Sequence, residues 1–501
     1  MRFQRAMRSA ACWGAFLIQA LAGCERAPEP KAEAPARPYQ GVKLVVGAVG
    51  DPAILASVKS QRGEWAARTG GDIEIRDTPV DPAKVEGVDV LIFTGDRMGD
   101  LVEAKTLAAI PDAAVEAGSE ASDAFAYQEI VPAYRDLVTR YGPDRMALPL
   151  GGSALVIAYR RGALERPEIR EAAEKAGIKL GPPRTWEEFD ALARFLHGKD
   201  WDGDGAPESG LALAWGSDPE GVGDGIWLAR AAASAFHKDQ FAFLLDSETT
   251  APRVASPPFV ESLRALVGLA ASGPAEAKAF DAEAARKAFR TGEAALLIDR
   301  AERASSWGET PDAAIGVWPL PGSGRVFDPS RQAWEESADP NRPTYLLNGG
   351  GWLAGVVAAG TRRDAALDFA RHLSGPEASD RMRAEKGFPM LAVRGPQLAK
   401  GMNSPRSAPG VEARPWAEAV RKTMENERIA PGLRIPDAPG YLADLARARA
   451  SAVGGTPVDQ ALDALAKAWA DRSKARGEAL QTWHHRRGLP GVITPPEPPS
   501  R

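Results

Sequence analysis

Cysteine and histidine are scarce in this 501-residue chain. Both cysteines, Cys12 and Cys24, lie among the first 24 residues, so the rest has no disulfide, thiolate metal site or cysteine nucleophile. The five histidines form no zinc-protease pattern, and G-x-S-x-G and P-loop motifs are missing. We expect His372, His484 and His485 at the surface. A hydrolase would have to rely on carboxylate pairs, which makes a binding protein the better hypothesis.

A positive charge excess is also missing. The chain has 62 basic and 67 acidic residues, a formal net charge of -5, and removing the three arginines of the first 24 residues makes it -8. This balance argues against nucleic acid or an anionic membrane surface as the main partner. We expect a monomer with no nucleic-acid partner and no organic cofactor. A chain of this length has room for a large core, and two lobes are expected.

The N-terminus predicts export and lipid anchoring. Three arginines precede an apolar stretch over residues 10–22, which is shorter than the about 20 residues of a membrane-spanning helix. It ends in Leu-Ala-Gly-Cys24, which resembles a bacterial lipobox; the alternative is an ordinary signal peptide with a chance cysteine. We expect residues 1–24 to be a lipoprotein signal peptide and residues 25–40, rich in Pro and Ala, to be a disordered tether. The protein would then be extracytoplasmic, anchored to a bacterial membrane on its periplasmic face.

Three apolar runs predict the start of a parallel sheet. Residues 42–49, 73–76 and 88–93 read as strands separated by helical segments, the second of which ends at Gly70-Gly71. Ligands bind beyond the carboxyl ends of the strands in such sheets. Polar residues follow the first and third runs, and they can bind a ligand or cap a helix. These candidates are Asp51, Asp96 and Arg97.

The middle of the chain changes character. Two extended runs, residues 146–150 and 154–159, are joined by Gly151-Gly152-Ser153. Thr185 and Glu188 form a capping box that predicts a helix after Thr185. Residues 282–290 predict another helix, followed by a strand over 295–298.

An Asp-rich segment resembles an EF-hand-like calcium loop. Oxygen-bearing side chains occupy positions 1, 3, 5 and 9, and Gly205 stands at position 6, where the loop turns sharply. Leu211 stands where the bidentate Glu of position 12 belongs, and an Asp/Gly turn without metal is the alternative. The predicted structural Ca²⁺ ligands are Asp200, Asp202, Asp204, Ala206 and Glu208.

Tryptophan is frequent, with 13 residues against 7 tyrosines. A Trp face can cover the C–H face of a sugar ring, although most tryptophans of a chain pack in its core. Trp215, Trp227 and Trp352 follow strand or loop positions near the expected ligand site. Trp352 is the strongest candidate because the glycines before it let the backbone and the ring approach a ligand closely.

The order of these segments resembles the family 1 extracellular solute-binding proteins, the maltose-binding-protein-like receptors of ABC importers. The motifs include VLIFTGDRMGDL (90–101), ALPLGGSALVIAYRR (147–161), PRTWEEFDALARFL (183–196), AFRTGEAALLID (288–299), AALDFARHLSGPEAS (365–379) and TPVDQALDALAKAW (456–469). The resemblance spans residues 42–472, and the chain departs from the family pattern at 321–347 and 397–433.

The resemblance implies an α/β fold of the type II periplasmic-binding-protein class, with a ligand cleft between two lobes joined by three crossovers. By analogy the crossovers lie near 150–153, 299 and 387–389. The expected N-terminal lobe contains residues 41–150 and 300–386. The expected C-terminal lobe contains residues 151–299 and 387–480, and a tail, 481–501, follows.

The implied function is capture of a small solute by hinge closure, without chemistry, and its delivery to ABC permease subunits. The solute is expected to be a carbohydrate, and an oligosaccharide, a polyol or glycerol phosphate all fit. A sensor or scaffold lipoprotein of the same fold and a secreted glycan-acting enzyme are the alternatives. The candidate ligand-binding residues are Asp51, Asp96, Arg97, Gly152, Ser153, Trp215, Trp227, Asp299 and Trp352.

Overall fold

The computed structural model describes residues 37–48, 52–78, 85–116, 124–309, 314–385, 388–400, 408–492, 494–495 and 497–499. The predicted signal peptide, Cys24, Asp51 and residues 25–36 of the predicted tether lie outside these ranges. Residues 37–40, also expected in the tether, pack on the folded chain instead. The Tyr39 amide donates a hydrogen bond to the Thr69 carbonyl at 2.9 Å, and the Tyr39 ring stacks on Trp65 with 6.1 Å between centroids.

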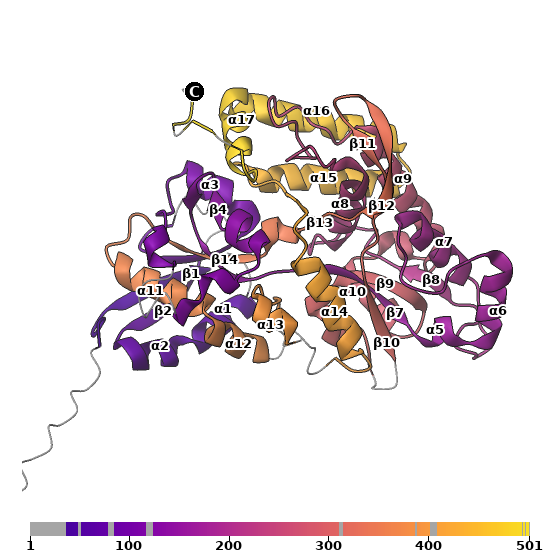
Figure 1. Cartoon of the computed structure of the whole chain (residues 1–501), viewed down its shortest axis with the longest axis horizontal. Helices are drawn as coiled ribbons and strands as arrows, with labels where there is room; N and C mark the ends of the chain where they lie inside the picture. Colours follow the sequence, from indigo (N-terminus) through magenta and orange to yellow (C-terminus); the bar gives the residue numbers. More distant parts are fainter. Residues whose placement is uncertain are drawn as a thin grey trace, which may run out of the picture.

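The chain forms two lobes, each built around its own sheet (Figure 1). The sheet of the first lobe has the order β2-β1-β3-β14-β6, in which β1 is parallel to β2 and β3 while β14 is antiparallel to both of its neighbours. Its strands are β1 (Lys43–Ala48), β2 (Asp72–Asp77), β3 (Val90–Thr94), β6 (Leu148–Gly151) and β14 (Trp352–Val356). Its helices are α1 (Pro52–Ser60), α2 (Arg62–Thr69), α3 (Met98–Glu103), α11 (Arg363–Ser374), α12 (Pro376–Ala384) and α13 (Gly395–Ala399).

The sheet of the second lobe has the order β10-β7-β9-β8. Its strands are β7 (Leu155–Arg160), β8 (Ser209–Ala212), β9 (Ala294–Arg300) and β10 (Ile315–Pro319). Three short pairs complete the strands of the described chain. The pair β4 (Arg140–Tyr141) with β5 (Asp144–Arg145) belongs to the first lobe, whereas β11 (Ser323–Asp328) with β12 (Ala333–Asn341), and β13 (Thr344–Tyr345) with β15 (Ile429–Ala430), belong to the second. The helices are α5 (Gly162–Glu165), α6 (Pro167–Ala176), α7 (Trp186–Leu196), α8 (Val222–Ala235), α9 (Pro257–Leu269), α10 (Ala282–Arg290), α14 (Ala413–Met424), α15 (Ala438–Val453), α16 (Val458–Arg476) and α17 (Glu478–Arg487).

Local sequence signals account for several element ends. Gly70 ends α2 with a left-handed backbone at φ 75°, which glycine adopts without strain. Thr185 caps α7 by accepting a hydrogen bond from the Glu188 amide at 3.4 Å, and the Glu188 carboxylate accepts one from the Arg184 amide at 2.6 Å. The predicted cap by Thr185 is therefore present, while Glu188 reaches the amide of Arg184, one residue before the N-cap, and not that of Thr185.

The chain passes between the lobes at places that only partly match the expected ones. The first passage joins β6 to β7 over residues 151–155, close to the expected 150–153. No passage lies near 299, because β10 returns antiparallel to β7 in the second sheet. The second passage lies between β13 and β14, so residues 315–345 belong to the second lobe and the expectation for them is wrong. A strand pattern alone cannot tell which of two sheets the strand joins.

The third passage also differs from the expected position. Residues 388–399, expected in the second lobe, pack on the first. The Val131 amide donates to the Val393 carbonyl at 2.9 Å, and buried Arg394 donates to the Ser374 carbonyl at 2.8 Å. The chain therefore passes to the second lobe between α13 and α14.

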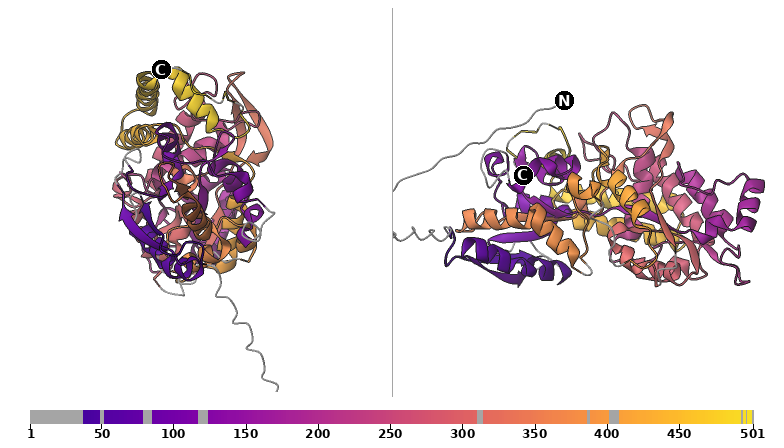
Figure 2. Two further views of the ribbon diagram at one scale, coloured as in Figure 1. Left: turned by 90° about the vertical axis from the view of Figure 1, so that its left-hand side faces the viewer. Right: turned by 60° about the horizontal axis from the view of Figure 1, so that its bottom comes forward.

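The C-terminal helices extend the second lobe, where α15 and α16 pack against α9. Residues 481–487, expected in a tail, belong to α17, one of the yellow helices near the C-terminus in Figure 2. His484 and His485 of this helix are buried. The helix has no apolar period because its buried face carries polar side chains, so no local pattern predicts its packing. In the described ranges, no helix is long and apolar enough to cross a bilayer.

Candidate functional site

The carboxyl end of β3 brings the predicted Asp96 and Arg97 to the region between the lobes. Both residues belong to a 3-10 turn, η2 (Gly95–Arg97), that follows the strand directly. The Asp96 Oδ1 atom is buried, and no described residue forms a hydrogen bond with it. An unpaired buried acceptor costs free energy, so this atom marks a place where a ligand could donate a hydrogen bond.

A glycine-rich segment, Asn348–Gly351, carries the chain from the second lobe to this turn, and we call it the glycine passage. Its four residues have φ values of 51°, 65°, 113° and 114°. A Cβ atom on Gly349 would overlap the main chain of Asp96, and one on Gly351 would lie 2.5 Å from the Gly151 carbonyl oxygen. The glycines therefore let the passage fit between η2 and the first crossover.

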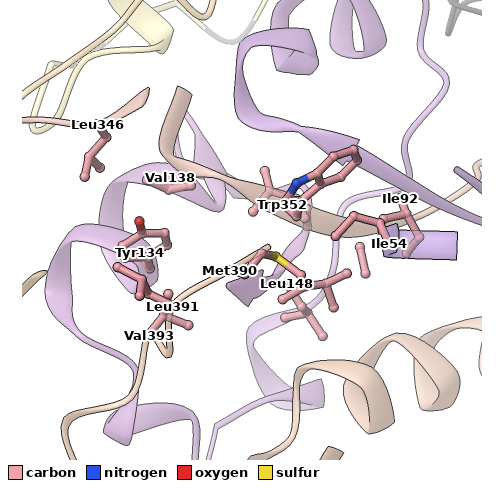
Figure 3. Packing of buried hydrophobic residues seen from close by; sticks show 14 of the residues in the cluster. Ile54, Ile92, Tyr134, Val138, Leu148, Leu346, Trp352, Met390, Leu391 and Val393 are labelled. Atoms are coloured by element: carbon pink, nitrogen blue, oxygen red, sulfur yellow. The ribbon is translucent and has the colours of Figure 1, made fainter. Parts of the chain in front are cut away.

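The predicted Gly152 and Ser153 form the first crossover. Gly152 exchanges two main-chain hydrogen bonds with Leu391, at 3.0 and 2.8 Å. A Cβ atom on Gly152 would overlap the hydroxyl of Tyr134, a fully buried residue of the π-helical turn η5 (Ala133–Val138) that lies beside Leu391 in Figure 3. Burial raises the pKa of Tyr134, and the charge of nearby Glu302 adds to the rise. The Ser153 Oγ atom is buried and has no hydrogen-bond partner in the described chain.

The predicted Asp299 lies at the end of β9 and is held by its own lobe. Its carboxylate accepts hydrogen bonds from Arg286 Nε at 2.8 Å and from the Trp307 indole at 2.7 Å. Only 1% of the Asp299 surface is exposed. Asp299 thus orders the end of β9 and has little capacity left for a ligand.

Glu220 gathers three arginines next to Asp299. Its carboxylate lies 2.8 Å from Arg286 and 3.4 Å from each of Arg300 and Arg303. Burial alone would raise the pKa of Glu220, but Arg286, with Arg303 and Arg300, lowers it below the ordinary value. The network fixes the loop that follows β9.

Glu302 stands in that loop and was not predicted. Its Oε1 accepts a hydrogen bond from Arg300 Nε at 2.9 Å, while its buried Oε2 has no partner among the described residues. The available signal was its place just beyond the carboxyl end of β9, the edge at which ligands bind in such sheets. The crossover expected near residue 299 pointed to Asp299 instead.

These residues form a continuous set that we call the interlobe site: Asp96, Tyr134, Gly152, Ser153 and Glu302. The glycine passage contacts both Asp96 and the first crossover, Gly152 contacts Tyr134, and Tyr134 lies within the electrostatic reach of Glu302. Four side-chain oxygens of the set are buried without partners among the described residues, namely Asp96 Oδ1, the Tyr134 hydroxyl, Ser153 Oγ and Glu302 Oε2. Such an arrangement can bind a solute that carries several hydroxyl groups.

The structure separates the predicted tryptophans. Trp215 and Trp227 are fully buried in the second lobe, where their indole N–H groups donate to the Leu266 carbonyl and to Ser262 Oγ, both at 3.1 Å. Both therefore pack in the core, and we do not retain them as candidates for the cleft. Trp352 begins β14 opposite Thr94, at the edge where Asp96 lies, and is 9% exposed. Its contact with a ligand stays a prediction.

The predicted calcium loop brings its carboxylates together. Asp200, Asp202, Asp204 and Glu208 each offer an oxygen within 4.8 Å of the others. Main-chain amides of the loop donate to the three aspartates, and the Trp201 amide donates to Glu208 at 3.0 Å. Leu211, at position 12, is buried in β8 and supplies no ligand. The donor set suits Ca²⁺, with Glu208 as a part-buried member.

Solved structures share this architecture. A solute-binding protein from Agrobacterium radiobacter K84, in complex with ribitol, has a TM-score of 0.60 at 20% identity, covering 87% of this chain and all of its own. A second, from Agrobacterium vitis S4 with bound D-mannitol, has a TM-score of 0.55 at 17% identity, covering 87% and 99%. Maltose-bound MalE3 of T. maritima has a TM-score of 0.59 at 18% identity, covering 86% and 100%. At these identities the likeness establishes the fold.

No curated protein matches the sequence. The sequence model of the family described as "Bacterial extracellular solute-binding protein" matches residues 81–380, which is more than half of the chain and includes most of the interlobe site. The chain belongs to the bacterial extracellular solute-binding protein family.

Proposed function

We propose that this protein binds a neutral, hydroxyl-rich solute, a sugar or a polyol, at the interlobe site and delivers it unchanged to an ABC importer. The observation that carries the proposal is the set of partnerless buried oxygens on Asp96, Tyr134, Ser153 and Glu302. Sugar hydroxyls both donate and accept hydrogen bonds, so one ligand could satisfy these oxygens together. Trp352 would supply an apolar face at the same edge. The ribitol, mannitol and maltose bound by proteins of the same fold support this class of ligand.

The glycine passage and the first crossover supply the hinge in this proposal. Both lie between the two sheets, and closure of the lobes would bury the ligand at the interlobe site. The two partnerless carboxylate oxygens, on Asp96 and Glu302, can only accept hydrogen bonds, which favours a solute with hydroxyl donors over an anionic solute such as glycerol phosphate.

A thermal-shift screen of the unacylated domain against sugars and polyols tests the proposal. A ligand present at about 100 times its dissociation constant should add about 2.7 kcal/mol of stability. Asp96→Asn and Glu302→Gln should each weaken the affinity for the identified ligand by about 10-fold to 100-fold, because each removes a charged acceptor. Asp463→Asn, an exposed change on α16, is the matched control and should bind normally. Unchanged affinity in both site variants would place the ligand elsewhere.

Membrane attachment belongs to the same proposal. We infer that Cys24 is acylated after signal cleavage and holds the protein on the periplasmic face of a bacterial membrane, because residues 21–24 match a lipobox. The experiment is fractionation of cells that express the full chain. The native protein should sediment with membranes, and Cys24→Ser should release it or block its maturation. Equal sedimentation of both forms would contradict the anchor.

The proposed role involves no chemistry, and two alternatives are tested alongside it. Incubation of the protein with the ligand that the screen identifies, followed by product analysis, should return the ligand intact; turnover would favour the glycan-acting enzyme. Loss of ligand uptake on deletion of the gene would support the importer over a sensor or scaffold. We also propose a structural Ca²⁺ at Asp200, Asp202, Asp204, Ala206 and Glu208.

A further inference from the structure

A cavity lies within the second lobe, beside β10 and α14, two elements that pack together in Figure 1. It has a volume of about 580 Å³, within the range typical of small-molecule sites, and the loop before α7 also lines it. None of its lining residues belongs to the interlobe site. Any ligand that it binds would therefore be separate from the solute in the cleft.

The floor of this cavity is an aromatic pair. The rings of Tyr159 on β7 and Trp318 on β10 stack with centroids 3.9 Å apart and planes inclined by 21°. Gly316, directly opposite Tyr159 in the sheet, makes this possible, because a Cβ atom there would overlap the Tyr159 ring. Pro183 and Pro415 stand at the sides and limit the movement of the walls. Because the rings stack face to face and Trp318 is buried, the less buried Tyr159 ring offers the apolar face on which a flat ring can lie.

The rim of the cavity is strongly basic. Arg184, Arg342, Arg414 and Lys422 line it together with a single carboxylate, Glu418. Lys422 pairs with Glu418 at 2.9 Å, and Arg184 lies 3.8 Å from the carboxylate of Asp339, outside the lining. Arg342 and Arg414 form no ion pair with a described residue, so basic groups outnumber carboxylates at the rim and produce a local positive potential.

Arg342 is the residue most affected by this crowding. It donates a hydrogen bond to the Arg184 carbonyl at 3.1 Å, which holds the two cations close together. Burial lowers the pKa of Arg342, and the positive charge of Arg184 lowers it further, while Glu188 and Asp339 oppose the shift. A bound anion would relieve the repulsion and would accept hydrogen bonds from the guanidinium groups. The first turn of α14 (Ala413–Met424) also lines the cavity, and a helix N-terminus favours negative charge.

We propose that this cavity binds a small organic anion, a carboxylate or phosphate joined to a flat ring, with the ring against the Tyr159 face of the aromatic pair and the anion between Arg342 and Arg414. The neutral solute of the interlobe site lacks the charge that this cavity requires. The second lobe would then bind this anion independently of the solute at the interlobe site.

Phenyl phosphate is the probe, and isothermal titration of the whole unacylated domain is the measurement. We expect saturable binding at one site, weakened by added NaCl because the attraction is between charges near the surface. Inorganic phosphate and benzyl alcohol should bind more weakly than phenyl phosphate. The first lacks the ring, and the second lacks the anion. Equal affinity for inorganic phosphate would overturn the role of the aromatic floor.

Arg342→Gln and Arg414→Gln should each weaken the affinity for phenyl phosphate about tenfold, the effect of one lost charge-assisted hydrogen bond. Both side chains are exposed, so the variants should fold, and unchanged binding of the interlobe ligand would confirm it. Arg170→Gln, an exposed change on α6, is the matched control and should bind the probe normally. Saturation-transfer NMR on the native protein should show the phenyl protons in contact with the protein. Absence of saturable binding, or native affinity in the double arginine variant, would overturn the proposal.

Discussion

The hydroxyl of Tyr141, in the first lobe, donates a hydrogen bond to the main-chain oxygen of His484, in α17, at 3.0 Å. Next to it, the Gly142 amide donates to the Arg487 carbonyl at 2.6 Å, and Arg487 pairs with Asp144 at 2.8 Å. The opposite side of α17 contacts the second lobe, where Arg486 pairs with Glu248. The C-terminal helix therefore bridges both lobes, and it must move or stretch when they open.

Removal of α17, by ending the chain at Gly477, should make the open state more populated. The contacts of Tyr141 and Asp144 with the helix are lost, so less free energy holds the lobes together. We expect a larger radius of gyration in solution scattering without ligand and a weaker affinity for the interlobe ligand. An unchanged radius would show that α17 moves with one lobe only.

Tyr141→Phe removes one oxygen atom from the contact between the first lobe and α17. It removes a buried hydrogen bond with His484 and should lower the free energy of unfolding by about 1 kcal/mol in urea titrations. Tyr39→Phe is the control, because the Tyr39 hydroxyl donates to the Asp364 carbonyl in an exposed contact. Its loss should cost much less, since water replaces the partner.

Gly350→Ala should damage the glycine passage. Gly350 has φ 113°, where side chains are strained, and a Cβ atom there would lie 2.6 Å from Val138 Cγ2. We expect a loss of about 1–3 kcal/mol in the free energy of unfolding, together with weaker binding at the interlobe site. Gly268→Ala, in α9 with no atom near the new methyl group, is the control and should leave stability equal or higher. Native stability in Gly350→Ala would show that the passage can shift without cost.

Sequence patterns predicted the parts of the fold that depend on local physics. The runs before Asp51 and Asp96 are the parallel strands β1 and β3, and Thr185 caps α7 as expected. Asp96, Gly152 and Ser153 lie at the interlobe site because strand ends converge at one edge of a parallel sheet, whichever residues fill the strands.

The misses depend on information that local patterns do not contain. Strand β10 could have joined either sheet, and its pairing with β7 is a property of the whole chain. Trp215 and Trp227 follow strand or loop positions, yet their indoles find partners on α9, which a sequence pattern cannot show. Glu302 is one of many carboxylates, and only the packing around Tyr134 leaves one of its oxygens without a partner.

Calcium should stabilise the second lobe if the Asp-rich loop binds it. Addition of Ca²⁺ to chelator-treated protein should raise the melting temperature, because a cation neutralises carboxylates that the loop now holds within 4.8 Å of each other. The charges of Asp202, Asp204 and Asp200 add to the burial that raises the pKa of Glu208 in the metal-free loop. Asp202→Asn with Asp204→Asn should abolish the response, and exposed Asp463→Asn should keep it. A melting temperature independent of Ca²⁺ and EDTA in the native protein would remove the site.

The buried imidazole of His485 should make the protein less stable in mild acid. Burial lowers the pKa of His485 to about 4, and the nearby Arg253 lowers it while Asp246 opposes the shift. Below about pH 6.5 the unfolded chain takes up a proton that the folded chain does not accept until the pH approaches 4. The contribution is therefore complete above about pH 6.5 and falls by about 3 kcal/mol as the pH drops toward 4.

Urea titrations from about pH 7.5 to about pH 4.5 measure this loss. His485→Gln should be less stable at neutral pH but should show a shallower decline, since it has no proton to bind. Part of the decline should persist, because burial also lowers the pKa of His372, to about 4. The double variant with His372→Gln should flatten the profile further. An identical slope in native protein and His485→Gln would mean that α17 opens in acid before the rest of the fold, so that His485 takes up its proton without unfolding the lobes.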